Sequence, residues 1–193
     1  MRVHEICFAQ FAVAALAVMF SSSFAHAEDR FVAVGQRVSV LIAMPDFAHA
    51  GKPEESRQSG IGQMGQHIVI DELIPSGEPF ERWTSLYAIK LEEGVDLSFD
   101  DYVGQLMAIY LNACDMKAEM IGSSNIGANH VRLVMPCQSY RNTPAVGELA
   151  IFDIRQQNTS FINIYQHWRG EAFNAGDVST WPIDEEGVTI FMG

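Results

Sequence analysis

The sequence is poor in cysteine, in basic residues and in long apolar runs. Its 193 residues include 3 Cys, and 12 Lys and Arg stand against 24 Asp and Glu, for a formal net charge of −12. Nucleic-acid binding depends on a basic surface that neutralises phosphates, so we expect no nucleic-acid partner. The acidic excess instead favours solubility and attraction to a basic partner.

The longest apolar run lies near the N-terminus and is too short to span a membrane. It covers residues 8–20, whereas a transmembrane helix needs about 20 residues. Arg2 precedes the run and Ala25-His26-Ala27 follows it, which is typical of a secretory signal peptide with its cleavage site. We therefore expect residues 1–27 to be a signal peptide and residues 28–193 to be an exported bacterial protein, periplasmic or secreted, without membrane insertion after cleavage.

The cysteines indicate a structural disulfide. Cys7 leaves with the predicted signal peptide, so Cys114 and Cys137 are the pair that remains. An even number of cysteines in an exported protein favours a bridge. Their spacing is not the C-x-x-C of a redox-active pair, so we predict a Cys114–Cys137 disulfide that stabilises the fold.

The common sequence motifs of catalysis and metal binding are missing. There is no G-x-S-x-G, and His49, His67, His130 and His167 do not have the spacings of a zinc site. Neighbouring carboxylates such as Asp100 and Asp101 are explained by helix capping and solvation. We therefore predict no catalytic, cofactor-binding or metal-binding residue, and we favour a non-enzymatic protein over an enzyme.

One stretch, "GIGQMG" at residues 60–65, has the G-x-G-x-x-G spacing of a dinucleotide-binding loop. That loop requires a strand before it and a helix N-terminus at its third glycine, where the phosphate binds. Here a polar stretch precedes the glycines and a strand-like stretch follows them. We predict that the glycines lie at the end of a long exposed loop, residues 46–65, and do not bind a nucleotide.

Alternating and continuous apolar patterns predict mostly strands. We expect "GSSNIG" to link a weak strand at 118–121 to the strand at 130–137, and the last two strands to form a hairpin. The segment 183–191 fits a helix or a strand. The predicted strands are 37–44, 66–74, 84–91, 118–121, 130–137, 148–154 and 160–168.

One helix is predicted from Ser98 to about Cys114. Ser98 is a favourable N-cap residue, and Asp100 and Asp101 lie in the first turn, where the helix dipole favours negative charge. Apolar residues recur every three or four positions through this segment. That spacing indicates an amphipathic helix with one face on a sheet.

The most distinctive surface prediction involves Trp83, Tyr165, His167 and Arg169. Alternation along the strand at 160–168 places Tyr165 and His167 on one face, with Arg169 just beyond. Aromatic rings together with a guanidinium suit recognition of an anionic or planar group. The structural alternative is that Trp83 anchors the end of a sheet and Arg169 pairs with an acidic residue.

The order of elements resembles that of the PsbP, Mog1 and DcrB-like family, which includes small exported accessory proteins; a cystatin-like or nuclear-transport-factor-like fold fits the same order. We predict an α+β fold in which one long amphipathic helix packs on an antiparallel β-sheet, as a single disulfide-bridged domain. The predicted function is an exported binding or accessory protein for an unknown protein or small molecule, including an inhibitor or immunity-type protein for a basic partner. The alternative is a small exported hydrolase or metal-dependent enzyme.

Overall fold

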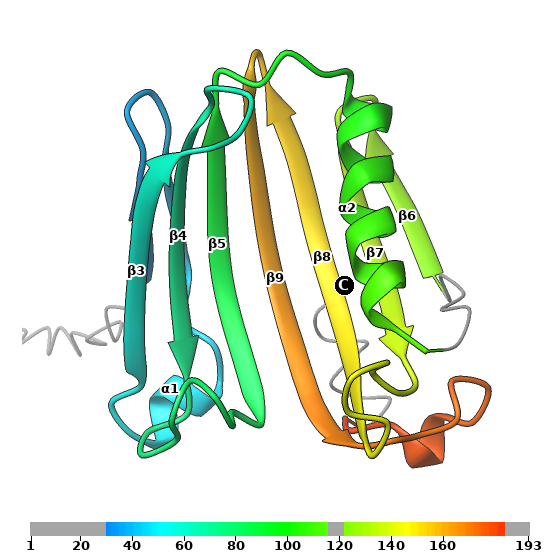
Figure 1. Cartoon of the computed structure of the whole chain (residues 1–193). Helices are drawn as coiled ribbons and strands as arrows, with labels where there is room; N and C mark the ends of the chain where they lie inside the picture. The colour runs from blue at the N-terminus through cyan, green and yellow to red at the C-terminus, as the bar shows by residue number, and fades with distance from the viewer. Residues whose placement is uncertain (1–29, 116–121, 184–193) are drawn as a thin grey trace, which may run out of the picture.

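A computed structural model describes residues 30–115 and 122–183. Seven strands form one antiparallel sheet in the order β3-β4-β5-β9-β8-β7-β6 (Figure 1). The strands are β3 (Glu54–Ile61), β4 (His67–Ile74), β5 (Ser85–Glu93), β6 (Gly122–Gly127), β7 (His130–Cys137), β8 (Val146–Gln157) and β9 (Ser160–Glu171). The predicted antiparallel sheet is thereby confirmed.

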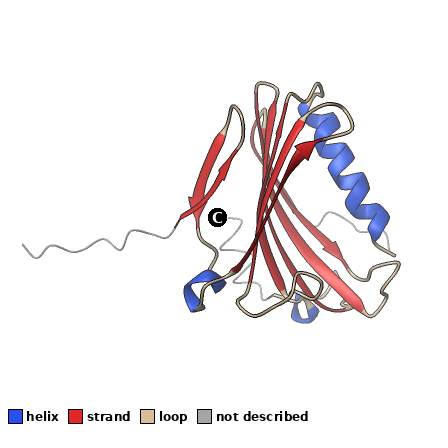
Figure 2. Ribbon diagram, turned by 60° about the vertical axis from the view of Figure 1, so that its left-hand side comes forward, coloured by secondary structure: helices blue, strands red, loops and turns tan. Residues whose placement is uncertain are grey.

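The sheet carries a helix on one face and a hairpin on the other. The long helix α2 (Phe99–Ala113) lies against one face, and the hairpin of β1 (Arg30–Val34) and β2 (Ser39–Ala43) packs on the opposite face (Figure 2). A short helix α1 (Phe47–Ala50) and a 3-10 turn η1 (Val178–Thr180) complete the described elements. One hydrophobic core lies under α2 and another lies under the hairpin, with smaller clusters elsewhere on the sheet.

The helix α2 begins where the sequence predicts. The Ser98 hydroxyl oxygen accepts a hydrogen bond from the Asp101 amide at 3.1 Å, so Ser98 is the N-cap residue. Tyr102 and Tyr110 of the helix are buried, and they pack with the inward residues of β7, namely Val131, Leu133, Met135 and Cys137. That β7 face is the one predicted from the alternation of the sequence.

The prediction of a long loop at residues 46–65 is wrong. Residues 54–61 form β3, which pairs along its full length with β4. Only the last part of "GIGQMG" is irregular, because Gly62–Gly65 form the β3–β4 turn. The strand was not recognised because it is an edge strand with almost every side chain exposed, so it lacks an apolar alternation.

One further prediction is confirmed and one needs correction. The strand predicted at 37–44 is β2, and it pairs with β1, which was not predicted, across a turn that begins at Gly35. The "GSSNIG" segment is the strand β6 rather than a link, and it pairs with β7. The predicted signal peptide and the strand at 118–121 lie outside the described residues, as does most of the segment 183–191.

The β1–β2 turn is held by a carboxylate from the main sheet. Glu93, 4% exposed, accepts hydrogen bonds from the backbone amides of Gln36, Arg37 and Val38 at 2.6–2.8 Å. Burial alone would raise the pKa of Glu93, but these three bonds and His67 lower it below its ordinary value. The ionised carboxylate therefore connects the hairpin to β5.

We expect Glu93→Gln to destabilise the protein by about 2 kcal/mol, because a neutral amide is a weaker acceptor and brings an NH₂ group against backbone donors. Urea unfolding at pH 7 measures the change. Glu55→Gln, which removes the same charge from an exposed position on β3, serves as the control. Equal stability of the two variants would contradict this role of Glu93.

Candidate functional site

The candidate site lies where β8 begins and β9 ends. Glu148 of β8 is directly opposite Arg169 of β9, and Ala150 is opposite His167. Side chains two residues apart on a strand share a face, so the antiparallel register brings Glu148, His167 and Arg169 together. Glu148 is also opposite Cys137 of β7, which places the disulfide beside the same cluster.

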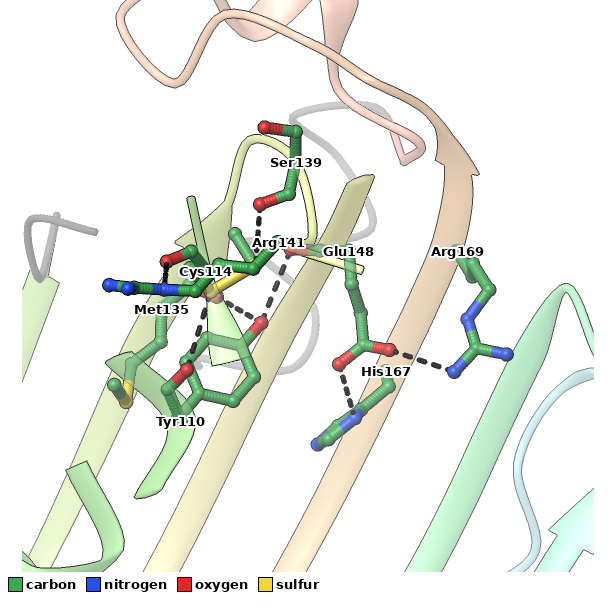
Figure 3. The surroundings of a disulfide bond; sticks show 9 residues. Tyr110, Cys114, Met135, Ser139, Arg141, Glu148, His167 and Arg169 are labelled. Atoms are coloured by element: carbon green, nitrogen blue, oxygen red, sulfur yellow. Dashed lines mark hydrogen bonds and ion pairs between the residues drawn. A yellow bond between two sulfur atoms is a disulfide. The ribbon is translucent and has the colours of Figure 1, made fainter. Parts of the chain in front are cut away.

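Glu148 is a buried carboxylate at the centre of this cluster. It is 2% exposed, and its oxygens lie 2.9 Å from His167 Nδ1 and 3.3 Å from Arg169 Nη2 (Figure 3). Burial alone would raise its pKa, but His167, a hydrogen bond from Tyr140 and the Arg169 charge lower it below the ordinary value. Glu148 is therefore ionised at neutral pH and fixes the groups around it.

Arg169 is held on a second side by aromatic rings. Its guanidinium carbon lies 3.7 Å from the centroid of the Trp83 ring and 5.9 Å from that of Tyr140. A guanidinium over an aromatic face is attracted by the ring quadrupole. Among the described residues, Arg169 Nε is buried without a hydrogen-bond partner. Stacking and the ion pair with Glu148 together fix the orientation of this cation.

The disulfide and the end of α2 help to position this cluster. Cys114, which ends α2, is bonded to Cys137 of β7, as predicted. The Arg141 amide donates to the Ala113 carbonyl at 3.0 Å, and the Arg141 Nε donates to the Cys114 carbonyl at 2.7 Å. These bonds attach the loop that carries Tyr140 to the end of the helix, and Figure 3 shows the bond between Arg141 and Cys114.

A cavity of about 550 Å³ opens beside this cluster. Its lining combines the buried or half-buried Trp83, Tyr140 and Arg169 with the exposed Glu81, Arg82, Asn142 and Thr143. A volume of this size is within the range of about 300–1,000 Å³ that is usual for small-molecule sites. The lining offers aromatic faces, two guanidinium groups and neutral hydrogen-bonding groups to a ligand.

The structure brings the four residues of the predicted surface together. The ring centroids of Trp83 and His167 are 6.3 Å apart, and those of Tyr165 and His167 are 5.0 Å apart. Trp83 and Arg169 line the cavity, whereas Tyr165 packs against the core under α2. Arg169 therefore pairs with an acidic residue, Glu148, and also lines a cavity.

Glu148 and Tyr140 are not among the residues predicted from the sequence. A sequence pattern could have identified Glu148, because this acidic residue shares its strand face with two apolar residues, Ala150 and Phe152. Both of them are buried. Tyr140 lies in a polar loop, and no sequence pattern there could have identified it. Their relation to Arg169 arises only from the pairing of β8 with β9 and from the disulfide.

Among residues 30–115 and 122–183, no three His, Cys, Asp or Glu side chains gather as a metal-binding group would, and no helix has the length and apolarity to cross a membrane. Comparison of the chain with protein-family models, curated proteins and solved structures finds no match. The resemblance in element order to the PsbP, Mog1 and DcrB-like family stays a prediction.

Proposed function

We propose that this is an exported binding protein that takes a small planar anion into the cavity beside Trp83 and Arg169. The observation that carries the proposal is the guanidinium of Arg169, fixed between Glu148 and the Trp83 ring at the wall of the cavity. A cation held in advance loses little side-chain entropy when a ligand binds. The disulfide supports export, since such bonds persist in oxidising compartments.

The proposal extends to the organisation and location of the chain. We infer that residues 28–193 form a single domain, with α2 as its amphipathic helix, in the periplasm or outside the cell. Packing of α2, β7, β8 and β9 into one core and the bridge between α2 and β7 support this.

The guanidinium groups of the lining favour an anionic ligand. Arg82 and Glu81 contribute one charge of each sign, and Arg169, which pairs with Glu148 at 3.3 Å, contributes a second guanidinium. A guanidinium matches a carboxylate in geometry, and aromatic walls match a flat ring. An aromatic carboxylate therefore fits better than a cation, even though the net charge of the chain is −12. If the protein also acts as an inhibitor or immunity protein, its basic partner would bind another part of the surface.

The arrangement of His167 favours binding over hydrolysis. Its Nδ1 is 2.9 Å from Glu148, and its Nε2 is buried and has no partner among the described residues. A general acid or base must reach the proton it transfers. Because both ring nitrogens are enclosed by protein, His167 serves to position Glu148.

We expect benzoate to bind this cavity and benzamide, its uncharged counterpart, to bind at least tenfold more weakly. An ionic hydrogen bond contributes about 1.5–3 kcal/mol, which corresponds to roughly a tenfold or greater difference. Titration of the Trp83 fluorescence, with Trp168 and Trp181 replaced by phenylalanine, measures both affinities.

Glu81→Gln should strengthen benzoate binding about two- to fivefold, because it removes a like charge worth under about 1 kcal/mol from the exposed lining. Benzamide binding should not change. Glu55→Gln on β3 removes the same charge far from the cavity and is the matched control. Equal gains in both variants, or a gain for benzamide, would speak against recognition of an anion here.

A further inference from the structure

A second cavity, of about 380 Å³, lies between α2 and the β3–β4 turn. We define it as the α2 groove by its apolar walls, which are Met64 of the turn, Ile68 of β4, Leu97, and Leu106 and Ile109 of α2. It shares no lining residue with the cavity beside Trp83 and Arg169. Its turn is the irregular part of the "GIGQMG" stretch.

On each side of the α2 groove, a large apolar side chain is exposed to solvent. Ile109 is 71% exposed and Met64 is 57% exposed. Met64 sits in a well-defined turn, because the Gly65 amide donates to the Gly62 carbonyl at 3.0 Å and the Met64 amide donates to Gln66 Oε1 at 3.0 Å. Gly65 has φ +81°, which glycine adopts at little cost. The turn therefore keeps Met64 opposite the helix.

The polar floor of the α2 groove is electrically neutral and internally bonded. Glu92 is buried, and its carboxylate is 2.8 Å from Lys90 Nζ and accepts hydrogen bonds from the Tyr102 hydroxyl at 2.5 Å and Gln66 Nε2 at 3.4 Å. A ligand that brought its own charge to this floor would meet no unbalanced counter-charge. The floor therefore favours an uncharged occupant.

From these observations we propose that the α2 groove binds the alkyl chain of a monomeric single-chain amphiphile, with the head group left in solvent. Its volume suits a small molecule. A protein partner is the less suitable occupant, because a stable interface needs about 800 Å² from each side and only Met64 and Ile109 of the lining are strongly exposed apolar residues. Methionine adapts to chains of different shape.

The test uses hexyl, octyl and decyl maltoside below their critical micelle concentrations, with ¹³C methyl NMR of the full mature protein. Each methylene that enters the groove should strengthen binding by up to about fourfold, so two methylenes give up to about fifteenfold. The Met64 and Ile109 methyl signals should shift together, while the signal of Ile126, which is 48% exposed on β6, should not.

Two substitutions at exposed positions distinguish a loss of binding from a loss of stability. Ile109→Gln should weaken decyl maltoside binding about tenfold, and Ile126→Gln should leave it unchanged. The proposal is overturned if affinity does not depend on chain length, if the Ile126 methyl shifts as much as that of Ile109, or if the protein binds phosphatidylcholine vesicles but not monomeric maltosides. Benzoate titration in the same samples reports on the other cavity independently.

Discussion

Replacing Glu148 by glutamine is expected to lower the free energy of unfolding by about 3 kcal/mol at pH 7, the lower end of the cost of breaking a buried ion pair. The substitution leaves Arg169 and His167 without their carboxylate partner. The lower end applies because the Arg169 side chain is 28% exposed and water can compensate part of the loss. Urea unfolding measures the difference, with Glu171→Gln at the exposed end of β9 as the control.

The pH dependence of this difference has a defined sign. The pKa of Glu148 is lowered in the folded protein, so its stabilising contribution is present above the unfolded-state pKa of about 4.3. The contribution is lost as the pH falls through the lower folded-state value. The gap between wild type and Glu148→Gln should therefore narrow below about pH 4. A gap that stays constant from pH 7 to pH 3 would contradict the ionised state of Glu148.

The second large effect is expected on removal of the disulfide. Replacing both Cys114 and Cys137 by serine should destabilise the protein by about 3 kcal/mol, the loop-closure entropy expected for a bridge of this span; the sequence separation is 23. Benzoate binding should also weaken, because the bridge and the Arg141 hydrogen bonds position the loop that carries Tyr140. Urea unfolding and the fluorescence titration measure the two effects.

Reduction of the wild-type protein provides the control for that variant. Dithiothreitol should lower the stability of the wild type to that of the double serine variant and should not affect the variant itself. Mass spectrometry of peptides under non-reducing conditions should find Cys114 linked to Cys137. Two free thiols in the exported protein, or a wild type that is insensitive to reduction, would show that the bridge does not form.

The parts of the fold that were predictable have local causes. Ser98 and the apolar spacing after it define the beginning of α2, and alternation defines β7 with the same bounds, residues 130–137. The strand β3 has no such signal because it is exposed on both faces. The β1–β2 turn depends on Glu93, which is more than fifty residues away in the sequence, so the sequence around the turn could not reveal it.

The site was predictable only in part, for the same reason. Trp83, His167 and Arg169 were found because aromatic, imidazole and guanidinium groups stand out in or next to the strands of an acidic protein. Glu148 reaches them through the register of β8 on β9, and a shift by one residue would turn it to the other face. Pairing register is a tertiary property, so the ion pair with Arg169 required a structure.

The most direct test of the proposed function is NMR of the Arg169 side chain during addition of benzoate. With ¹⁵N-labelled arginine, the Arg169 Nε–H signal should shift with saturation, because benzoate would bind the guanidinium that Glu148 and Trp83 hold in place. The signal of Arg155, which is bonded to Asp153 outside the cavity, should stay unchanged, and benzamide should have little effect. No shift at Arg169, or equal shifts with benzoate and benzamide, would contradict an anion-binding site.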